Sequence, residues 1–293
     1  MSRSKLSLGV TAFIDILGFG DRVLSATSKK DINKVAASVK LIRKRFDHST
    51  KEDYIKESHK LSGTTVLAFS DSVIVNVPLQ SDITKIEGTF DPIMSEIASM
   101  ALAQGQCAAE GLFIRGGVDL GWWYKDGATL VSESLTRAYK AEGAANVPVI
   151  ALTPGLYKFL SQHKNRSWYS SDSDPVKKVF LRYSASTKAG RVSFWYLDYI
   201  TVFTESIGWQ TGKDQLEAFR TANAEQKIQI QEAGYRANVY RWFSQHARHI
   251  EDAYARATSD HVKSKYIWLA QYHNRVSRRY TKNKSCKCVV ENG

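Results

Sequence analysis

The chain has 293 residues, of which 43% are hydrophobic and 24% charged, as in globular proteins with a substantial core. Its three cysteines form no disulfide framework, and an aspartate interrupts the first apolar stretch, so neither a secreted scaffold, a signal peptide nor a membrane span is predicted. We therefore expect a cytoplasmic protein. The net charge of +12 is concentrated in residues 236–287, which hold twelve Lys and Arg against three acidic residues.

The first part of the chain predicts alternating strands and helices, because apolar residues form short β-rich runs there or recur at helical spacing. Only Ser70-Asp71-Ser72 separates the second strand from the third, which predicts a hairpin. In chain order the predicted elements are a strand at 8–17, a helix at 21–46, strands at 64–69 and 73–77, a helix at 83–102 and a strand at 112–120.

This order, β-α-β-β-α-β, is the split βαβ arrangement of a ferredoxin-like α+β fold. Later elements extend it: a further strand, a helix near 133–143 and strands at 148–152, 178–183 and 192–198, with 162–177 expected as a loop. From about residue 211 only helices are predicted, with two apolar faces that indicate an antiparallel pair. We assign residues 1–210 to one α+β domain and 211–293 to a basic helical extension.

The basic extension has several possible roles: a solvated helical face, a surface for nucleic acid, a support for a dimer or a sensor for a partner. No compact recognition motif accompanies its charge, so we do not expect nucleic acid as the partner. His246-x-x-His249 and Cys286-Lys287-Cys288 lack matched ligands at suitable spacing. A zinc site is therefore not predicted there.

Two aspartates carry the strongest chemical signal. Asp15 stands near the carboxyl end of the first strand and Asp71 at the tip of the hairpin. Each alone is explained by a helix cap or a turn. In the split arrangement, however, their strands are neighbours, and two close carboxylates repel each other unless a proton or a cation intervenes. The pair therefore predicts Mg²⁺ or Mn²⁺, and two such ions suit phosphoryl chemistry. Gly18 and Gly20 would add backbone N–H groups for phosphate.

Four stretches resemble motifs of the class III nucleotidyl cyclases. Two of them, FIDILGF at 13–19 and FSDSV at 69–73, are similar to the two metal motifs of the family. IRGGVDLG at 114–121 is similar to the strand that follows the second helix, and ESLTRAYKAE at 133–142 is similar to the helix that carries the transition-state residues. Together with the helical extension, the combination most resembles the bacterial pyrimidine cyclases of Pycsar antiphage defence.

The resemblance implies a homodimer that uses two Mn²⁺ or Mg²⁺ ions. Its substrate would be UTP or CTP, with UTP favoured, and its products the 3′,5′-cyclic nucleotide (cUMP or cCMP) and pyrophosphate. The cyclic nucleotide would activate a separate effector protein during antiphage defence. A class III cyclase catalytic domain would then occupy residues 1–210.

The resemblance also implies residue roles. Asp15, Asp71 and the backbone carbonyl of Ile16 would bind the ions. Phe13, Gly18, Phe19 and Gly20 would contact the nucleotide, although a core position is the plainer interpretation of Phe13.

Arg115, Thr136 and Lys140 would act in catalysis; the last two stand where the family has Asn and Arg. Arg115 has an alternative interpretation, a strand residue that reaches solvent or pairs with Asp119. Leu67 stands four residues before the second aspartate, where purine cyclases carry a polar residue that reads the base. Leucine makes no hydrogen bond, which suits a different base preference.

Other classes stay open. A catalytically degenerate cyclase-like module for nucleotide binding or dimerisation fits Lys140, because lysine lacks the bidentate fork of arginine. A diguanylate-cyclase-like enzyme or a palm-type polymerase shares the sheet and the aspartates. The former usually has an acidic, Gly-rich hairpin tip rather than Ser-Asp-Ser, and the latter needs DNA-gripping subdomains for which this chain has no room.

Overall fold

The computed structural model describes residues 6–46, 57, 60–187 and 190–290. The chain forms two compact units. The first comprises residues 1–107 and 112–199, and the second residues 108–111 and 200–293. The second unit therefore begins about ten residues before the boundary that the sequence pattern suggests.

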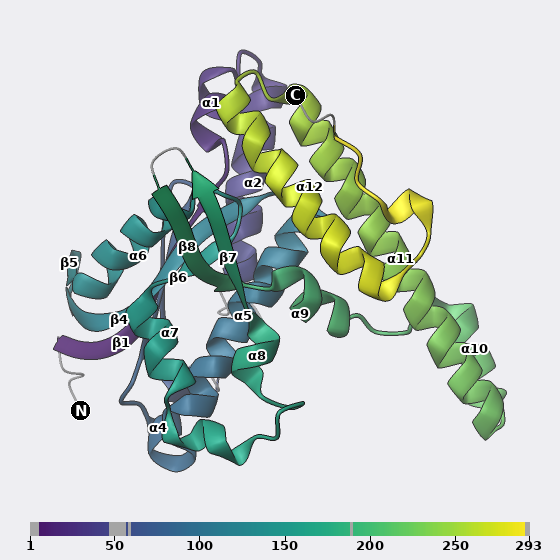
Figure 1. Cartoon of the computed structure of the whole chain (residues 1–293), viewed down its shortest axis with the longest axis horizontal. Coiled ribbons are helices and arrows are strands. Elements are labelled where there is room, and N and C mark those ends of the chain that lie inside the picture. Colours follow the sequence, from purple (N-terminus) through teal and green to yellow (C-terminus); the bar gives the residue numbers. More distant parts are fainter. Residues whose placement is uncertain (1–5, 47–56, 58–59, 188–189, 291–293) are drawn as a thin grey trace. The chain divides into compact units, whose positions relative to one another are not determined.

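The first unit is built on one eight-stranded mixed sheet (Figure 1). Its order is β2-β3-β1-β4-β6-β8-β7, and β5 pairs with β4 outside this path. The strands are β1 (Leu6–Ile16), β2 (Thr65–Phe69), β3 (Ser72–Pro78), β4 (Ile114–Asp126), β5 (Thr129–Ser132), β6 (Ile150–Leu152), β7 (Phe180–Thr187) and β8 (Gly190–Leu197). The first four pair antiparallel in the order 2-3-1-4, so the predicted ferredoxin-like α+β fold is confirmed. Among the described strands, β4 and β6 are the only pair that runs parallel.

Two helices that the sequence predicts as continuous are each broken in two. The helix expected at 21–46 is α1 (Phe19–Leu24) and α2 (Lys29–Phe46), since Ser28 accepts a hydrogen bond from the Asp31 amide and starts the second one. The helix expected at 83–102 is α4 (Asp82–Glu87) and α5 (Phe90–Ala109). Between them Gly88 has φ 78°, a conformation that glycine supplies and that ends the first helix.

Helices cover both faces of the central strands. On one face, Phe46 of α2 and Met100 of α5 meet Val75 of β3 around a small gap, and the apolar side chains Val10, Ala12 and Ile14 of β1 are fully buried. On the other face lies α6 (Glu133–Ala145). A Cβ on Gly117 of β4 would fall 1.9 Å from the carbonyl oxygen of Ala138, so only glycine allows this close approach.

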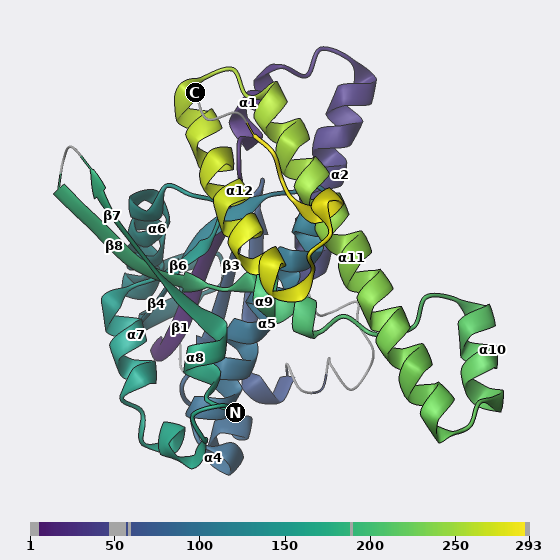
Figure 2. The ribbon, with the colours of Figure 1, turned by 45° about the vertical axis from the view of Figure 1, so that its right-hand side comes forward.

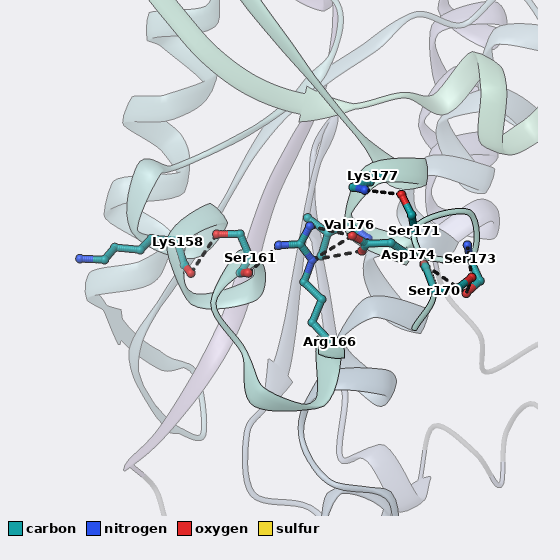
Figure 3. A network of polar contacts seen from close by, with 9 residues as sticks. All are labelled: Lys158, Ser161, Arg166, Ser170, Ser171, Ser173, Asp174, Val176 and Lys177. Carbon is teal, nitrogen blue, oxygen red and sulfur yellow. Dashed lines mark hydrogen bonds and ion pairs between the residues drawn. The ribbon is translucent and has the colours of Figure 1, made fainter. Parts of the chain in front are cut away.

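The segment 162–177, expected as a loop, contains structure. It follows α7 (Pro154–Ser161) and includes a 3₁₀ turn, η2 (Lys164–Trp168), and the start of α8 (Pro175–Val179). Figure 3 shows its polar network: the Arg166 guanidinium donates to both oxygens of Asp174 and, at 2.6 Å, to the Ser161 carbonyl. Asp174 also caps α8 by accepting from the Val176 amide at 3.0 Å. An arginine–aspartate pair within the segment thus orders a stretch whose sequence is mostly polar.

The second unit is helical, as predicted. Its helices are α9 (Tyr199–Glu205), α10 (Lys213–Thr221), α11 (Ala224–Arg256) and α12 (Asp260–Tyr280), followed by the 3₁₀ turn η3 (Lys284–Cys286). Figure 2 shows α11 and α12 antiparallel and side by side, with the C-terminal segment returning along α11. None of the helices among the described residues is long and apolar enough to cross a membrane.

A buried histidine pair joins the two long helices. His246 and His273 approach at 2.8 Å between their Nδ1 atoms, and His273 Nε2 lies 2.7 Å from the carbonyl oxygen of Cys286. A carbonyl only accepts, so Nε2 of His273 carries a hydrogen and its Nδ1 accepts from His246. Burial lowers the pKa of both imidazoles, that of His273 to about 4. Both rings are therefore neutral and structural at pH 7.

Candidate active site

The two aspartates lie at the same end of neighbouring strands. Residues of β1 and β3 pair as far as Ile14 and Val73. Asp15 is one residue beyond this pair, and Asp71 comes two residues before Val73. The end of β1 is held by the Leu17 amide, which donates to the Phe113 carbonyl at 2.9 Å. This is the sheet edge at which the split βαβ order predicts that they meet.

Asp71 stands in a tight two-residue turn. Phe69 of β2 pairs with Ser72 of β3, so Ser70 and Asp71 alone connect the strands. Ser70 has φ 52°, which lies in the left-handed region that costs a non-glycine residue energy. The position and backbone of Asp71 are therefore determined by the strand register.

Asp15 is bound by an arginine of the adjacent strand. Asp15 and Arg115 are directly opposite in the β1–β4 register, so their side chains share a face of the sheet. Arg115 Nε donates to Asp15 Oδ1 at 3.3 Å, and a terminal nitrogen donates to Oδ2 at 3.2 Å. Both carboxylate oxygens of the first predicted metal ligand thus accept from one guanidinium.

Glu142 of α6 is the second partner of Arg115. Its carboxylate lies 2.7 Å from the other terminal nitrogen of the guanidinium. Burial alone would lower the pKa of Arg115, but the carboxylates of Asp15 and Glu142 outweigh it and raise that pKa. Arg115 does not pair with Asp119, as one interpretation of the sequence expected, because four residues along a strand span about 13 Å.

An apolar row crosses the sheet beside Asp15. Leu67 is opposite Ile74, and Ile74 is opposite Phe13, so these three half-buried side chains lie on the face that carries Asp15. Phe13 also packs edge-on against Tyr139 of α6, with ring centroids 5.2 Å apart. Phe13 is therefore neither a core residue nor free on the surface. This row offers contact area but no hydrogen-bonding side chain.

Gly18, Phe19 and Gly20 form the turn into α1. Gly18 has φ 70° and precedes the helix, and a Cβ on Gly18 or Gly20 would meet nothing within 4 Å. The turn is thus open toward solvent on the side of these two glycines. Its position directly after β1 places the first-turn amides of α1 close in sequence to Asp15.

Thr136 and Lys140 lie elsewhere on α6. Both are exposed on its outer side, whereas Ala138 and Glu142 face the sheet. They line an open depression of about 520 Å³ between β4, β5 and α6. The Thr136 hydroxyl donates to the Ser132 carbonyl at 2.9 Å. Within the first unit, the structure therefore does not bring these two residues into the Asp15–Arg115–Glu142 cluster.

A second carboxylate cluster lies farther along β4. Asp119 is 2% exposed; its carboxylate accepts from the Thr153 hydroxyl and lies 3.9 Å from Arg137 of α6. Arg137 also pairs with Glu133 at 2.7 Å. Burial raises the pKa of Asp119, which the hydrogen bond from Thr153 and the charge of Arg137 only partly oppose.

Several solved structures of nucleotidyl cyclases align with this chain. A bacterial light-regulated adenylyl cyclase aligns at 15% identity and a TM-score of 0.39, over 66% of this chain and 91% of that one. The monomeric guanylyl cyclase domain of the RhoGC fusion protein from the aquatic fungus Blastocladiella emersonii aligns at 15% and 0.41, over 66% and 96%.

A class III adenylyl cyclase-like ATP-binding protein from Pseudomonas aeruginosa aligns at 12% identity and a TM-score of 0.41, over 84% of this chain and 59% of that protein. No protein-family model and no curated protein matches the sequence. Identities and TM-scores of this size assign neither a family nor an activity to the chain.

The site residue that sequence reasoning missed is Glu142. Its signal is visible in the pattern, because Ala138, Glu142 and Ala145 share the apolar face of α6. A carboxylate on a buried helical face requires a cationic partner. Its partner, Arg115, is 27 positions away in the sequence, and only the packing of α6 on β4 brings the two together.

Proposed function

We propose that this chain is a metal-dependent nucleotidyl cyclase of the class III type. Its reaction would be attack of the ribose 3′-oxygen on the α-phosphorus of a nucleoside triphosphate, giving a 3′,5′-cyclic nucleotide and pyrophosphate. The observation that carries the proposal is the position of Asp15 and Asp71 at one end of adjacent strands, beside a partly open apolar row. This arrangement suits in-line phosphoryl transfer, which depends on positioning and charge neutralisation.

The donor set fits a hard divalent cation. Two carboxylates and the Ile16 backbone carbonyl offer only oxygen, the ligand type that Mg²⁺ and Mn²⁺ prefer. Among the described residues no cluster of three or more His, Cys, Asp or Glu could hold an ion, so waters and substrate phosphates would complete the coordination. When bound, two such ions would supply Lewis-acid activation of the 3′-hydroxyl and neutralise charge on the leaving pyrophosphate.

The protein's own groups would bind and orient the nucleotide. The amides of Gly18, Phe19 and Gly20 would contact the β- and γ-phosphates, because the absence of side chains at the two glycines leaves room there. Phe13 would pack against the sugar or the base. Lys140 and Thr136 would act on the triphosphate of a partner subunit, since they are exposed and outside the Asp15 cluster of their own chain.

We propose that the working state is a homodimer. Leu6, Leu8, Trp122 and Val131 are exposed, and the pairing of β1, β4 and β5 places them on the sheet face opposite α6. Trp122 and Val131 also line the depression that contains Thr136 and Lys140. A second copy bound to this patch would therefore lie beside both candidate catalytic side chains.

We further propose a pyrimidine substrate, with UTP favoured over CTP. Leu67, at the position that reads the base in purine cyclases, belongs to the row Leu67–Ile74–Phe13, in which no side chain forms a hydrogen bond. A pyrimidine, which is the smaller base, would lose less hydrogen bonding on binding against this row than adenine or guanine would. The preference for UTP and the role of the product as a messenger to an antiphage effector rest on the sequence resemblance alone.

A catalytically degenerate nucleotide-binding module is the second candidate. One observation favours it: both oxygens of Asp15 accept from Arg115, which would oppose cation binding if the pair were permanent. A diguanylate-type reaction has no comparable support, although its linear dinucleotide product would be recognised in the same assay.

The test is to incubate the chain with Mn²⁺ and each of the four nucleoside triphosphates, and to identify products by mass. We expect cyclic UMP as the main product and cyclic CMP as the second, with no product from Asp71→Ala. Asp82→Ala, which removes an exposed aspartate of α4, is the matched control and should retain the wild-type rate. Nucleotide binding without turnover of any substrate would support the degenerate module and refute the cyclase.

A further inference from the structure

Arg115 lies between two carboxylates that differ in environment. Asp15 is 16% exposed and accepts at 3.2–3.3 Å, whereas Glu142 is 5% exposed and lies at 2.7 Å. The three charges come from β1, β4 and α6, so each is held by a different element. The Arg115 guanidinium thus pairs with two carboxylates, and the shorter contact is with the more deeply buried one.

The two contacts differ in what their loss would cost. Removing the partner of a buried carboxylate leaves an uncompensated charge, which is strongly unfavourable. A carboxylate that still reaches solvent, as the partly exposed Asp15 does, can be rehydrated or can accept another cation. The Arg115–Asp15 contact can therefore break while the Arg115–Glu142 contact persists, but the reverse exchange is costly.

We propose that Arg115 competes with divalent cations for Asp15, and that Glu142 is a positioning residue that retains the guanidinium when Asp15 binds an ion. This inference rests on the proposed function, because it assumes that Asp15 is a metal ligand. In the metal-free protein Arg115 neutralises Asp15. When a cation binds, the guanidinium stays with Glu142 and no buried charge is left without a partner.

The proposal predicts opposite effects on cation binding from removing the Glu142 carboxylate alone and from removing Arg115 and Glu142 together. In Glu142→Gln the guanidinium loses its second anion and binds Asp15 alone, so a divalent cation must displace a stronger pair. In the double variant Arg115→Gln/Glu142→Gln the competitor and the buried carboxylate are removed together, so the interior carries no unpaired charge and Asp15 is available. A purely structural role would weaken cation binding in both variants.

The experiment measures Mn²⁺ affinity of the full chain from the electron paramagnetic resonance signal of free Mn²⁺, without nucleotide. We expect about tenfold weaker binding for Glu142→Gln and about tenfold tighter binding for the double variant, relative to the wild type. Tenfold corresponds to about 1.4 kcal/mol, the lower end of what a hydrogen bond to a charged group contributes. Glu142→Asp should restore binding toward the wild-type value.

Glu133→Gln is the matched control, because it removes a carboxylate of the same helix that has its own arginine partner. It should bind Mn²⁺ as the wild type does, and circular dichroism should show every variant folded. Equal affinities in all variants, or weaker binding in both the single and the double variant, would overturn the gating role and leave the cyclase proposal intact. No Mn²⁺ binding by any variant, the double one included, would overturn both.

Discussion

Gly117→Ala should separate α6 from the sheet. The new Cβ would lie 1.9 Å from the Ala138 oxygen, 2.8 Å from the Ala138 carbonyl carbon and 3.0 Å from the Glu142 nitrogen. All three atoms belong to helix backbone, so no side-chain rotation relieves the clash. An ordinary contact needs about 3.4 Å, which requires α6 to retreat by about 1.5 Å.

Overpacking of this kind costs about 1–3 kcal/mol. The retreat would also weaken interactions that hold α6 in place, namely the Phe13–Tyr139 ring contact, the Thr11–Ser134 hydrogen bond at 2.6 Å and the Arg115–Glu142 ion pair. We therefore expect the free energy of unfolding to fall by about 3 kcal/mol, measured from urea denaturation at constant m-value.

Gly143→Ala is the control, because it makes the same chemical change within α6 where a Cβ meets nothing within 4 Å. Alanine is the better helix former, so this variant should be more stable by about 0.5–1 kcal/mol. Changes of opposite sign in the free energy of unfolding of the two variants would support the close approach of α6 to β4. A loss below 1 kcal/mol in Gly117→Ala, or equal shifts in both variants, would refute it.

Four further predictions follow from the site and the helical unit. Asp71→Ala should abolish turnover yet remain dimeric by light scattering, and a near-normal rate would remove Asp71 from the metal site. Trp122→Lys should shift the proposed homodimer to monomer in the same measurement. Ser70→Gly should raise the free energy of unfolding by up to about 1 kcal/mol in urea, because it relieves the left-handed turn. Burial lowers the pKa of His273 from its ordinary 6.5 to about 4, so the unfolded chain binds more protons, and this residue should reduce stability by up to about 3 kcal/mol as pH drops from 6.5 to 4. In urea titrations His273→Gln should lose this share of the dependence and keep the share of His246, whose pKa is also lowered by burial, and an unchanged slope would contradict the prediction.

The neighbourhood of Asp15 and Asp71 could be predicted from the sequence, because it depends only on strand order. A hairpin between two helices gives the β2-β3-β1-β4 order, and the register then places both residues at one edge. Strand boundaries hardly matter for this conclusion. β4, expected to end at residue 120, continues to Asp126 without changing the relation of the two aspartates.

What the sequence did not predict depends on local caps and long-range charge. The breaks at Ser28 and Gly88 interrupt helices whose apolar periodicity continues across them, so periodicity alone does not reveal the breaks. The Arg166–Asp174 pair orders a segment that composition marks as a loop. The partner of Arg115 depends on how α6 lies on β4, and no sequence pattern specifies that contact.

The two-residue turn at Ser70 and Asp71 limits where the sequence can accept insertions and deletions. Side chains alternate between the faces of a strand, so inserting or deleting one residue in β2 or β3 would move Asp71 off its edge and turn every following side chain to the other face. Point substitutions at the tip alter one group, whereas a single insertion there would alter the whole edge. We expect length variation among natural variants to be absent from β1–β3 and concentrated in the connections outside the sheet, such as residues 162–174.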